Sequence, residues 1–267
     1  MVKINLSNVY TSNKYIKYNE LTYKDIDSPC YERALIIDKF IKKNKIKSVL
    51  DVGCSTGSLI KFLKKRNKKT DFYGCDISPE IINKIIKDPT LDNKKFFVDN
   101  VSGLKTSKCF DLIICFGVIQ FITNPLKVIN KLSKNLNKNS YLIIATQNFL
   151  FTFVSFSQIA ANFLKKVTNL KNKKFLEISK YFIKNNNKYN VNNYFSPKHN
   201  NIEILNTISL SEYFKEKNYE INYVYSDYYN YHSKFLRTNK KNFTSQKNKW
   251  KKSFFSSAAL HIFKKTL

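Results

Sequence analysis

From residue 29 to residue 142 the chain alternates between two hydrophobic patterns at short spacing. In one pattern apolar residues recur every three or four positions, which predicts an amphipathic helix, and in the other they follow one another directly, which predicts a buried strand. The helical pattern covers residues 29–43, 57–67, 78–87 and 124–136, and the strand pattern covers residues 47–52, 71–75, 95–99, 110–116 and 140–146. Strands without polar alternation, separated by helices, are typical of a parallel sheet that is covered on both faces. We therefore predict an α/β fold built on a doubly wound, Rossmann-like sheet.

The alternation breaks after Thr146 and returns later in the chain. Residues 149–199 combine an apolar, helical stretch with lysine-rich and asparagine-rich runs, and then a helix is predicted at 209–218 and strands at 219–226 and 258–263. These two strands bring the predicted sheet to seven strands, which remain mostly parallel. We predict a single domain over residues 1–267, with a helical extension at about 1–45 and a helical cap inserted at about 149–199.

The composition adds a formal charge of +28 to this picture. Such a charge favours nucleic acid or an anionic membrane as a partner, but only three of the 47 basic residues are arginine: Arg33, Arg66 and Arg237. Nucleic-acid readers depend on the planar fork of arginine, and a mixture of lysine, asparagine, isoleucine and tyrosine is what AT-rich codons supply. Because lysine carries almost all of the charge, the charge alone does not indicate nucleic acid, and a nucleic-acid partner stays only a weaker alternative.

The N-terminal residues, the apolar stretch 149–164 and the cysteines bear on the compartment of the protein and on metal binding. The first fifteen residues have no apolar central region of a secretory leader, and the apolar stretch 149–164 is interrupted by polar residues and is short of the roughly 20 residues that span a bilayer. We expect no transmembrane segment and a cytoplasmic protein. The five cysteines form no C-x-x-C pair and have no histidine at a zinc spacing, so we expect free thiols and no metal site.

The segment VLDVGCSTGSLI, residues 49–60, is a glycine-rich turn between a predicted strand and a predicted helix, and it has three interpretations. A dinucleotide fingerprint would need glycine at Ser55 and Ser58, so this interpretation fails. A hydrolase elbow would make Ser55 a nucleophile, with Asp227 and either His232 or His261 completing a triad. Few strands precede Ser55, which leaves the hydrolase as a remote alternative. In the third interpretation the turn cradles a nucleotide-like cofactor.

The third interpretation agrees with further motifs along the chain. The runs LDVGCSTG, FYGCDIS, FFVDNVSGL and FDLIICFGVIQFITNP, in this order and spacing, resemble the class I S-adenosylmethionine-dependent methyltransferases over about residues 30–148. Residues 209–226 and 258–265 add a weaker resemblance to the family's last helix and final antiparallel strand pair. The resemblance implies S-adenosylmethionine as cofactor, and the intact motifs favour an active enzyme over an inactive, methyltransferase-like binding protein.

The resemblance also implies which residues bind the cofactor. Asp51 would bind the ammonium group of the cofactor, Asp76 would accept hydrogen bonds from the ribose hydroxyls, and Asp99 would accept a hydrogen bond from the adenine amino group. The glycines permit close approach of the cofactor, and Ser55 is part of the cradle. The implied set is Asp51, Gly53, Cys54, Ser55, Gly57, Asp76, Ile77, Asp99, Asn100, Val101, Cys115 and Phe116. The catalytic residues stay unknown.

The acceptor of the methyl group is less defined by the sequence. The segment CFGVIQFITNP lacks the N/D-P-P-Y run of amino-methylating nucleic-acid enzymes, and no cysteine nucleophile follows the fourth strand as in carbon-5 pyrimidine enzymes. The chain looks most like the branch that acts on small molecules, with a hydroxyl of a sugar, lipid or quinone-like metabolite as acceptor. A hydroxyl needs a general base, for which His199 and His232 are candidates, whereas His261 in a predicted strand is structural.

Two further segments keep alternatives open. Residues 149–164 are interpreted as a cap helix packed on the sheet, or as a greasy lid that touches a lipid-linked substrate or a membrane surface. The tract 237–255 interleaves Phe243 and Trp250 with six lysines and has no acid, which is the best sequence support for an RNA methyltransferase. A solvated connection between the last two strands is the more ordinary interpretation of that tract.

Overall fold

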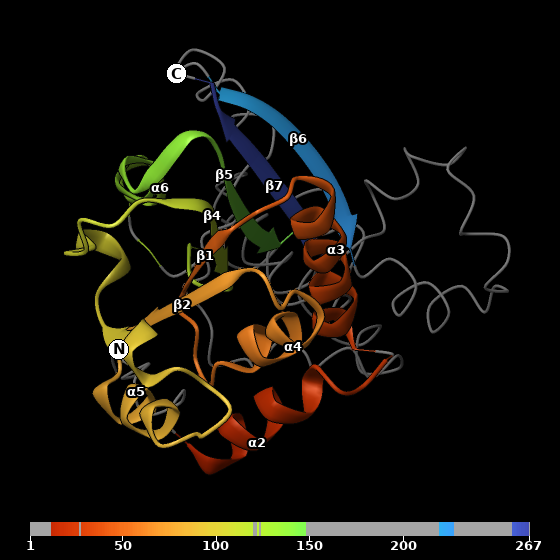
Figure 1. Cartoon of the computed structure of the whole chain (residues 1–267), viewed down its shortest axis with the longest axis vertical. Helices are drawn as coiled ribbons and strands as arrows, with labels where there is room; N and C mark the ends of the chain where they lie inside the picture. Colours follow the sequence, from red (N-terminus) through yellow and green to blue (C-terminus); the bar gives the residue numbers. More distant parts are fainter. Residues whose placement is uncertain are drawn as a thin grey trace, which may run out of the picture.

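The computed structural model describes residues 12–26, 28–119, 122, 124–147, 219–226 and 258–266. In these ranges seven strands form one sheet, which helices cover on both faces (Figure 1). The strands are β1 Ser48–Val52, β2 Asp71–Asp76, β3 Phe96–Val98, β4 Phe110–Phe116, β5 Leu136–Gln147, β6 Tyr219–Ser226 and β7 Ala258–Lys265. The α-helices are α2 Asn13–Thr22, α3 Pro29–Lys43, α4 Ser58–Arg66, α5 Pro79–Ile86 and α6 Pro125–Lys134, and short 3-10 turns lie at Asn93–Lys95 and Val101–Gly103.

The sheet has the strand order β3-β2-β1-β4-β5-β7-β6. Strands β1 to β5 pair in parallel, and β7 lies antiparallel between β5 and β6. The predicted α/β fold with a seven-stranded, mostly parallel sheet is therefore confirmed. Because the parallel strands all point the same way, the loops after β1, β2, β3 and β4 gather at one edge, which we call the carboxyl edge.

Three of the helices begin with the same local signal, a polar cap followed by proline. Ser28 caps α3, Ser78 caps α5 and Asn124 caps α6, and the cap side chains accept from backbone amides in the first turn. Proline at the first helical position loses no hydrogen bond and has the right φ. Helix α4 differs, because its N-cap is Gly57 at φ 70° and no side chain caps it. Helix α4 therefore begins at the glycine-rich turn without the polar cap and the proline that start the other three helices.

The two faces of the sheet bury separate apolar clusters. One cluster joins α3, α4 and α5 to residues such as Val49 of β1, and the other joins α6 to residues such as Leu50 of β1. Neighbouring β1 residues point to opposite faces and are both buried, which explains why the strand sequences show no polar alternation. Burial on both faces holds the carboxyl edge on a rigid support.

Several predictions from the sequence fall on other parts of the chain. The cap at 149–199, the helix at 209–218, His199, His232 and the basic tract at 237–255 lie outside the described residues. Helices α2 and α3 lie within the first 45 residues, and the assignment of an N-terminal helical extension stays a prediction. Over the described ranges no helix is long and apolar enough to cross a membrane. The single-domain assignment stays a prediction.

Candidate functional site

Three carboxylates lie at the carboxyl ends of three adjacent strands. Asp51 is in β1, Asp76 ends β2, and Asp99 follows β3 directly. Strand pairing places Asp51 opposite Gly74 and Asp76 opposite Val98. The parallel topology therefore gathers residues that are 25 and 23 positions apart in the sequence at one edge of the sheet.

The glycine-rich turn is held against β2 by its backbone. The amides of Gly53 and Cys54 both donate to the carbonyl of Cys75, at 2.8 and 3.0 Å, and the amide of Gly57 donates to the carbonyl of Cys54 at 2.9 Å. Gly53, Ser55 and Gly57 adopt positive φ angles of 76°, 46° and 70°. Glycine adopts this conformation without the cost that a side chain adds, so the glycines at 53 and 57 are explained by the turn itself.

The space around Gly53 gives a second reason for a glycine. A Cβ at Gly53 would lie 2.3 Å from Cγ2 of Val118, which belongs to the loop after β4. At Gly57 a Cβ would come 3.1 Å from Cδ1 of Leu91. The loops after β1 and β4 therefore approach each other so closely that only hydrogen fits between them at residue 53.

Asp76 connects the turn to the next loop through both carboxylate oxygens. Oδ2 accepts from the amide of Ser55 at 3.0 Å, and Oδ1 accepts from the amide of Ser78 at 3.0 Å. A carboxylate has about four lone-pair positions, so each oxygen keeps capacity for one further donor. Asp76 can hold the cradle in shape and still accept hydrogen bonds from a pair of ribose hydroxyls.

Asp51 is buried beneath this turn, with 4% of its surface exposed. Burial, reinforced by the negative charge of Asp76, raises the pKa of Asp51 to about 7. Desolvation disfavours the charged carboxylate, and the second carboxylate adds repulsion of the same sign. A cation placed between the two acids would relieve both penalties.

Asp99 organises the loop after β3. Its Oδ1 accepts from the amide of Asn100 at 2.8 Å, and its Oδ2 accepts from the amide of Lys105 at 2.9 Å. Asn100 in turn accepts from the amide of Ser102 at 2.9 Å, and Val101 is buried in the core. The loop is thus fixed by its own side chains, and Asp99, like Asp76, keeps lone pairs for a ligand donor.

Two apolar side chains are exposed beside the carboxylates. Ile77, which follows Asp76 directly, is 63% exposed. Val98, which pairs with Asp76 in the neighbouring strand, is 48% exposed. Large exposed apolar residues cost free energy unless something covers them, and a flat aromatic ring would do so. Ile77 belongs to the cofactor set that the resemblance implies, whereas Val98 is not in that set, because its sequence context is that of an ordinary strand residue.

Other predicted residues are placed differently. The side chains of Cys54 and Cys115 are buried in the core, and Phe116 packs partly buried against it. Burial raises the pKa of both thiols. A contact from Cys54 or Cys115 to a bound molecule would therefore come from their backbone and not from a thiolate.

Helix α2 adds contacts that the sequence did not indicate. The side-chain amide of Asn19 donates to the hydroxyl of Ser55 at 3.3 Å, and Tyr15 lies near both side chains. Burial is the main reason why the pKa of Tyr15 is raised. Helix α2 therefore engages the Ser55 hydroxyl. The histidine of the described residues is His261 in β7, which is buried and hydrogen-bonds with Thr146 at 2.8 Å, so it does not serve Ser55 as a base. This arrangement suits a turn residue and not a nucleophile.

The three carboxylates of the site differ from the lysine-paired acids of the described chain. Asp38, Asp71, Asp88, Asp92 and Glu220 each have a lysine ammonium within 4.0 Å. Among the described residues no lysine or arginine side chain forms such a pair with Asp51, Asp76 or Asp99. In a protein with a formal charge of +28, three acids without a basic partner form a site that fits a positively charged ligand.

Comparison with known sequences assigns the family. A family model described as a methyltransferase domain matches residues 43–196, which is more than half of the chain. Three similar relatives have methyltransferase names: malonyl-acyl-carrier-protein O-methyltransferase of Anoxybacillus flavithermus, the mitochondrial ubiquinone biosynthesis O-methyltransferase of Candida albicans, and tRNA U34 carboxymethyltransferase of Campylobacter jejuni. They are 28%, 24% and 30% identical over 43%, 52% and 42% of this chain. The matched stretches cover 49%, 48% and 39% of these relatives, which is less than half of each.

A solved structure agrees with the fold. The plantazolicin methyltransferase BpumL, solved in complex with SAH, is 15% identical, with a TM-score of 0.57 over 98% of this chain and 94% of that one. At this identity the likeness concerns the fold alone. Together with the family match over residues 43–196, it leads to one conclusion. The chain belongs to the class I S-adenosylmethionine-dependent methyltransferases.

Proposed function

We propose that this chain binds S-adenosylmethionine at the carboxyl edge and transfers its methyl group to a hydroxyl of a small molecule, such as a sugar, lipid or quinone-like metabolite. The observation that carries the cofactor part is the set of Asp51, Asp76 and Asp99, which have no basic partner in the described part of this lysine-rich chain. When bound, the cofactor supplies a sulfonium-activated methyl group and carries a cationic ammonium group.

Each part of the site has a separate task in this proposal. Asp51 holds the ammonium group from beneath the turn, and Asp76 accepts from the ribose hydroxyls while it fixes the amide of Ser55. Ile77 and Val98 cover the adenine ring, and the loop fixed by Asp99 closes its edge. The protein thereby orients the methyl group, and orientation is the main contribution to a displacement with a good leaving group.

The acceptor part rests on the motifs and on the relatives' names. The sequence lacks the marks of amino-methylating and carbon-5 nucleic-acid enzymes, and two of the three relatives are named O-methyltransferases. A hydroxyl acceptor needs a general base, and burial lowers the pKa of His261 to about 4, so that residue does not serve. His199 and His232 stay the candidates for this role.

Calorimetric titration with S-adenosylhomocysteine tests the cofactor site. We expect binding by the wild-type protein and a loss of at least about tenfold in affinity for Asp76→Ala, because a group that bonds two ribose hydroxyls is removed. Asp92→Ala is the matched control, since Asp92 is an exposed acid paired with Lys95 at 3.5 Å, and it should bind like wild type. Equal affinity of both variants, with unchanged melting temperatures, would contradict the proposed site.

An RNA methyltransferase is the second candidate, favoured by the relative named tRNA U34 carboxymethyltransferase and by the basic tract at 237–255. Incubation with radiolabelled S-adenosylmethionine separates the two acceptor classes. Label should enter the organic or low-molecular-weight fraction of a cell extract, and extract treated with ribonuclease should give the same yield. Incorporation into RNA that ribonuclease abolishes would replace the small-molecule acceptor by RNA.

A further inference from the structure

The basic charge of the described chain is concentrated in one part of it. Residues 39–69 contain eleven basic residues and one acid, which is the buried Asp51, whereas residues 70–111 contain six basic residues and seven acids. A uniform compositional bias would give both stretches the same excess of basic over acidic residues. The excess therefore belongs to the region formed by the second half of α3 and by α4.

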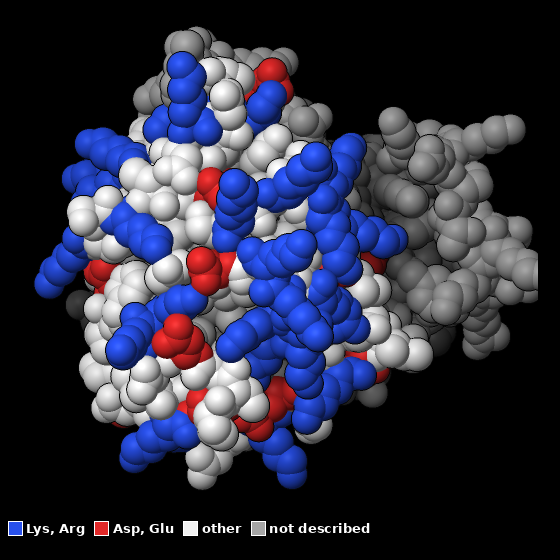
Figure 2. Space-filling model, viewed as in Figure 1, with Lys and Arg blue, Asp and Glu red and all other residues white. Residues whose placement is uncertain are grey.

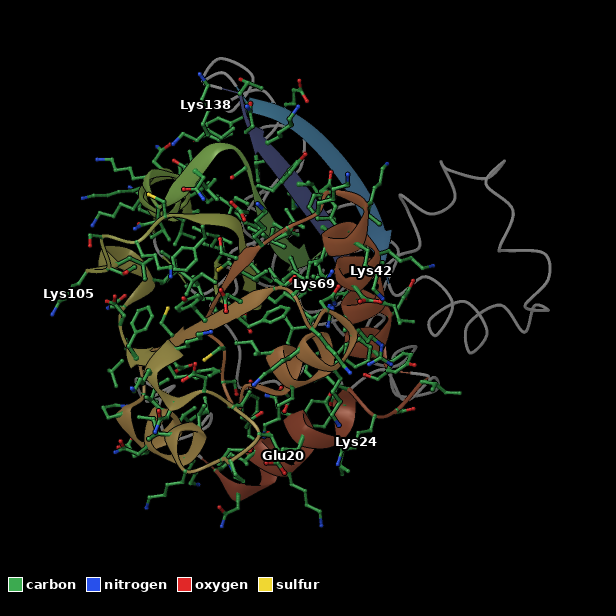
Figure 3. The ribbon with its side chains drawn as sticks, viewed as in Figure 1. Glu20, Lys24, Lys42, Lys69, Lys105 and Lys138 are labelled. Atoms are coloured by element: carbon green, nitrogen blue, oxygen red, sulfur yellow. The ribbon has the colours of Figure 1, made fainter. Side chains whose placement is uncertain are left out.

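These two helices lie side by side, so the excess forms one surface. Tyr31 of α3 and Phe62 of α4 meet at 5.4 Å between ring centroids, and the side-chain amide of Asn67 donates to the carboxylate of Asp38 at 2.7 Å. Figure 2 shows lysine and arginine gathered on the side of the molecule that these helices form. We call the surface formed by Lys24, Lys42, Lys61, Lys65, Arg66 and Lys69 the basic face, and Figure 3 shows Lys24, Lys42 and Lys69 on this side, with Lys105 and Lys138 far from it.

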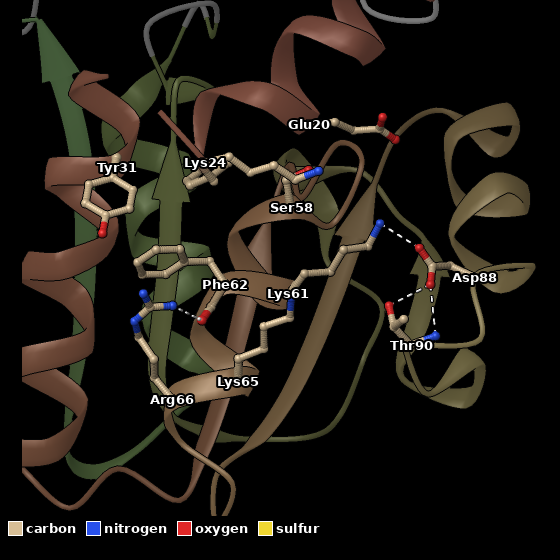
Figure 4. A pocket seen from close by; sticks show the side chains of 11 residues that line it. Glu20, Lys24, Tyr31, Ser58, Lys61, Phe62, Lys65, Arg66, Asp88 and Thr90 are labelled. Atoms are coloured by element: carbon tan, nitrogen blue, oxygen red, sulfur yellow. Dashed lines mark hydrogen bonds and ion pairs between the residues drawn. The ribbon is translucent and has the colours of Figure 1, made fainter. Parts of the chain in front are cut away.

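A groove of about 570 Å³ runs through the basic face along α4 (Figure 4). Lys61 in the groove pairs with Asp88 at 2.6 Å, and the Arg66 guanidinium lies 3.8 Å from the centroid of the Phe62 ring. Among the described residues, Lys24 and Lys65 have no carboxylate within 4.0 Å. The groove thus contains cationic groups available to an anionic partner.

Two exposed aliphatic residues flank Lys24 in the sequence. On the α2 side the groove is lined by Glu20, Tyr23 and Lys24. Leu21 of α2 is 51% exposed, and Ile26 in the following turn is 74% exposed. Exposed aliphatic residues next to lysines are typical of surfaces that lie in a membrane interface, where the apolar groups enter and the ammonium groups meet anionic headgroups. A phosphodiester backbone would offer nothing for Leu21 and Ile26 to bury against.

The kinds of cation also separate the two macromolecular partners. Five of the six residues of the basic face are lysines, and the planar Arg66 lies against Phe62. Lysines act as point charges that attract any anionic surface, whereas nucleic-acid readers use arginine forks and exposed aromatic faces. Phe62 is buried, and Tyr23 and Tyr31, which also line the groove, are partly buried and pack against the core.

We propose that the basic face, together with the exposed Leu21 and Ile26 that flank Lys24 in the sequence, docks on an anionic lipid bilayer. Helix α2 also contacts the cofactor turn through Asn19 and Ser55. Docking through α2 would therefore set one side of the methyl-transfer site near the bilayer, where a lipid or quinone-like acceptor resides. The proposal goes beyond methyl transfer, because vesicle binding is measured without cofactor or acceptor and either idea can fail alone.

Vesicle sedimentation with the full-length protein tests the proposal. We expect the protein to sediment with phosphatidylcholine vesicles that contain phosphatidylglycerol and to stay in solution with pure phosphatidylcholine. One lysine near an anionic surface contributes about fivefold in affinity, so Lys24→Gln, Lys65→Gln and Lys69→Gln together should weaken binding by about a hundredfold. The matched control replaces the exposed Lys105, Lys127 and Lys138 by glutamine and should change binding by less than about threefold.

The two exposed aliphatic residues need their own variant. Leu21→Ser with Ile26→Ser should weaken vesicle binding by at least about tenfold while the melting temperature stays near that of wild type, since both side chains are exposed. Equal losses for the two lysine triples would mean that net charge alone acts, which overturns the proposal. Binding to polyuridylate but not to vesicles, weakened by the basic-face triple, would assign the face to nucleic acid instead.

Discussion

Asp51 is the residue whose environment most directly links the fold to a ligand. It is buried under the glycine-rich turn beside Asp76, and its pKa is raised from 3.8 to about 7. Between these two pKa values Asp51 is protonated in the folded protein and ionised in the unfolded chain. The free energy of unfolding therefore falls as pH rises from about 4 to 7. A cationic ligand reverses the preference, because it favours the ionised carboxylate.

We therefore predict opposite effects of Asp51→Asn on stability and on binding. At pH 8 the variant should be more stable than wild type in urea unfolding, and the difference should shrink towards pH 5. S-adenosylhomocysteine should bind wild type more tightly at pH 8 than at pH 6, with proton release seen as a buffer-dependent binding enthalpy. The variant should bind more weakly and without this release. Wild-type stability that does not fall between pH 5 and 8 relative to Asp51→Asn would contradict the assigned environment.

Gly53 gives a second test at the residue scale, because its conformation and its surroundings can be separated. Gly117 has a similar φ of 68°, but among the described residues beyond its chain neighbours no atom would lie within 4 Å of a Cβ added there. Gly117→Ala should therefore cost only the left-handed strain of roughly 1–2 kcal/mol. Gly53→Ala should cost more, because Val118 lies 2.3 Å from the added carbon, and shortening the neighbour in Gly53→Ala with Val118→Ala should recover the difference. Urea unfolding measures all three, and equal costs for both single variants would disprove the close approach.

Between elements, a buried hydrogen bond joins α3 to the end of α4. Asn67 donates to the carboxylate of Asp38 at 2.7 Å and to the carbonyl of Leu63 at 3.0 Å. Asn67→Ala leaves a buried carboxylate oxygen without this donor, so we predict a loss of about 1–3 kcal/mol in the free energy of unfolding. Asn83→Ala in α5 is the control, since Asn83 is exposed, and it should stay within about 0.5 kcal/mol. A loss for Asn67→Ala no larger than for the control would show that the bond does not tie the helices together.

The elements also show which parts of the fold were predictable. The helices and strands from α3 to β5 followed from hydrophobic period and from caps such as Ser78-Pro79, because these signals are local. The resemblance implied an antiparallel pair for the last two strands, but the place of β7 between β5 and β6 was not predicted, since apolar strands carry no mark of their partners. The contact of Asn19 with Ser55 joins residues 36 positions apart through two common polar side chains, so no sequence pattern indicates it.

At the scale of the whole molecule, the charge is divided between two regions. Three acids without a basic partner, Asp51, Asp76 and Asp99, gather at the carboxyl edge, and the lysine excess lies on α3 and α4. Like charges this close repel one another in the folded state, and the unfolded chain relieves part of that repulsion by separating them. The formal charge of +28 therefore opposes folding most strongly when few counterions screen it.

Added salt should accordingly stabilise this protein. The screening length falls from about 30 Å at 0.01 M to about 3 Å at 1 M salt, so repulsion across the basic face is largely removed at high salt. We predict that the melting temperature rises by about 3 °C or more between 10 mM and 500 mM sodium chloride, measured by circular dichroism. The triple change of Lys24, Lys65 and Lys69 to glutamine should raise the melting temperature at 10 mM salt and reduce this rise, and the triple at Lys105, Lys127 and Lys138 should do so less. A melting temperature that falls with salt would mean that ion pairs such as Lys61 with Asp88 outweigh the repulsion.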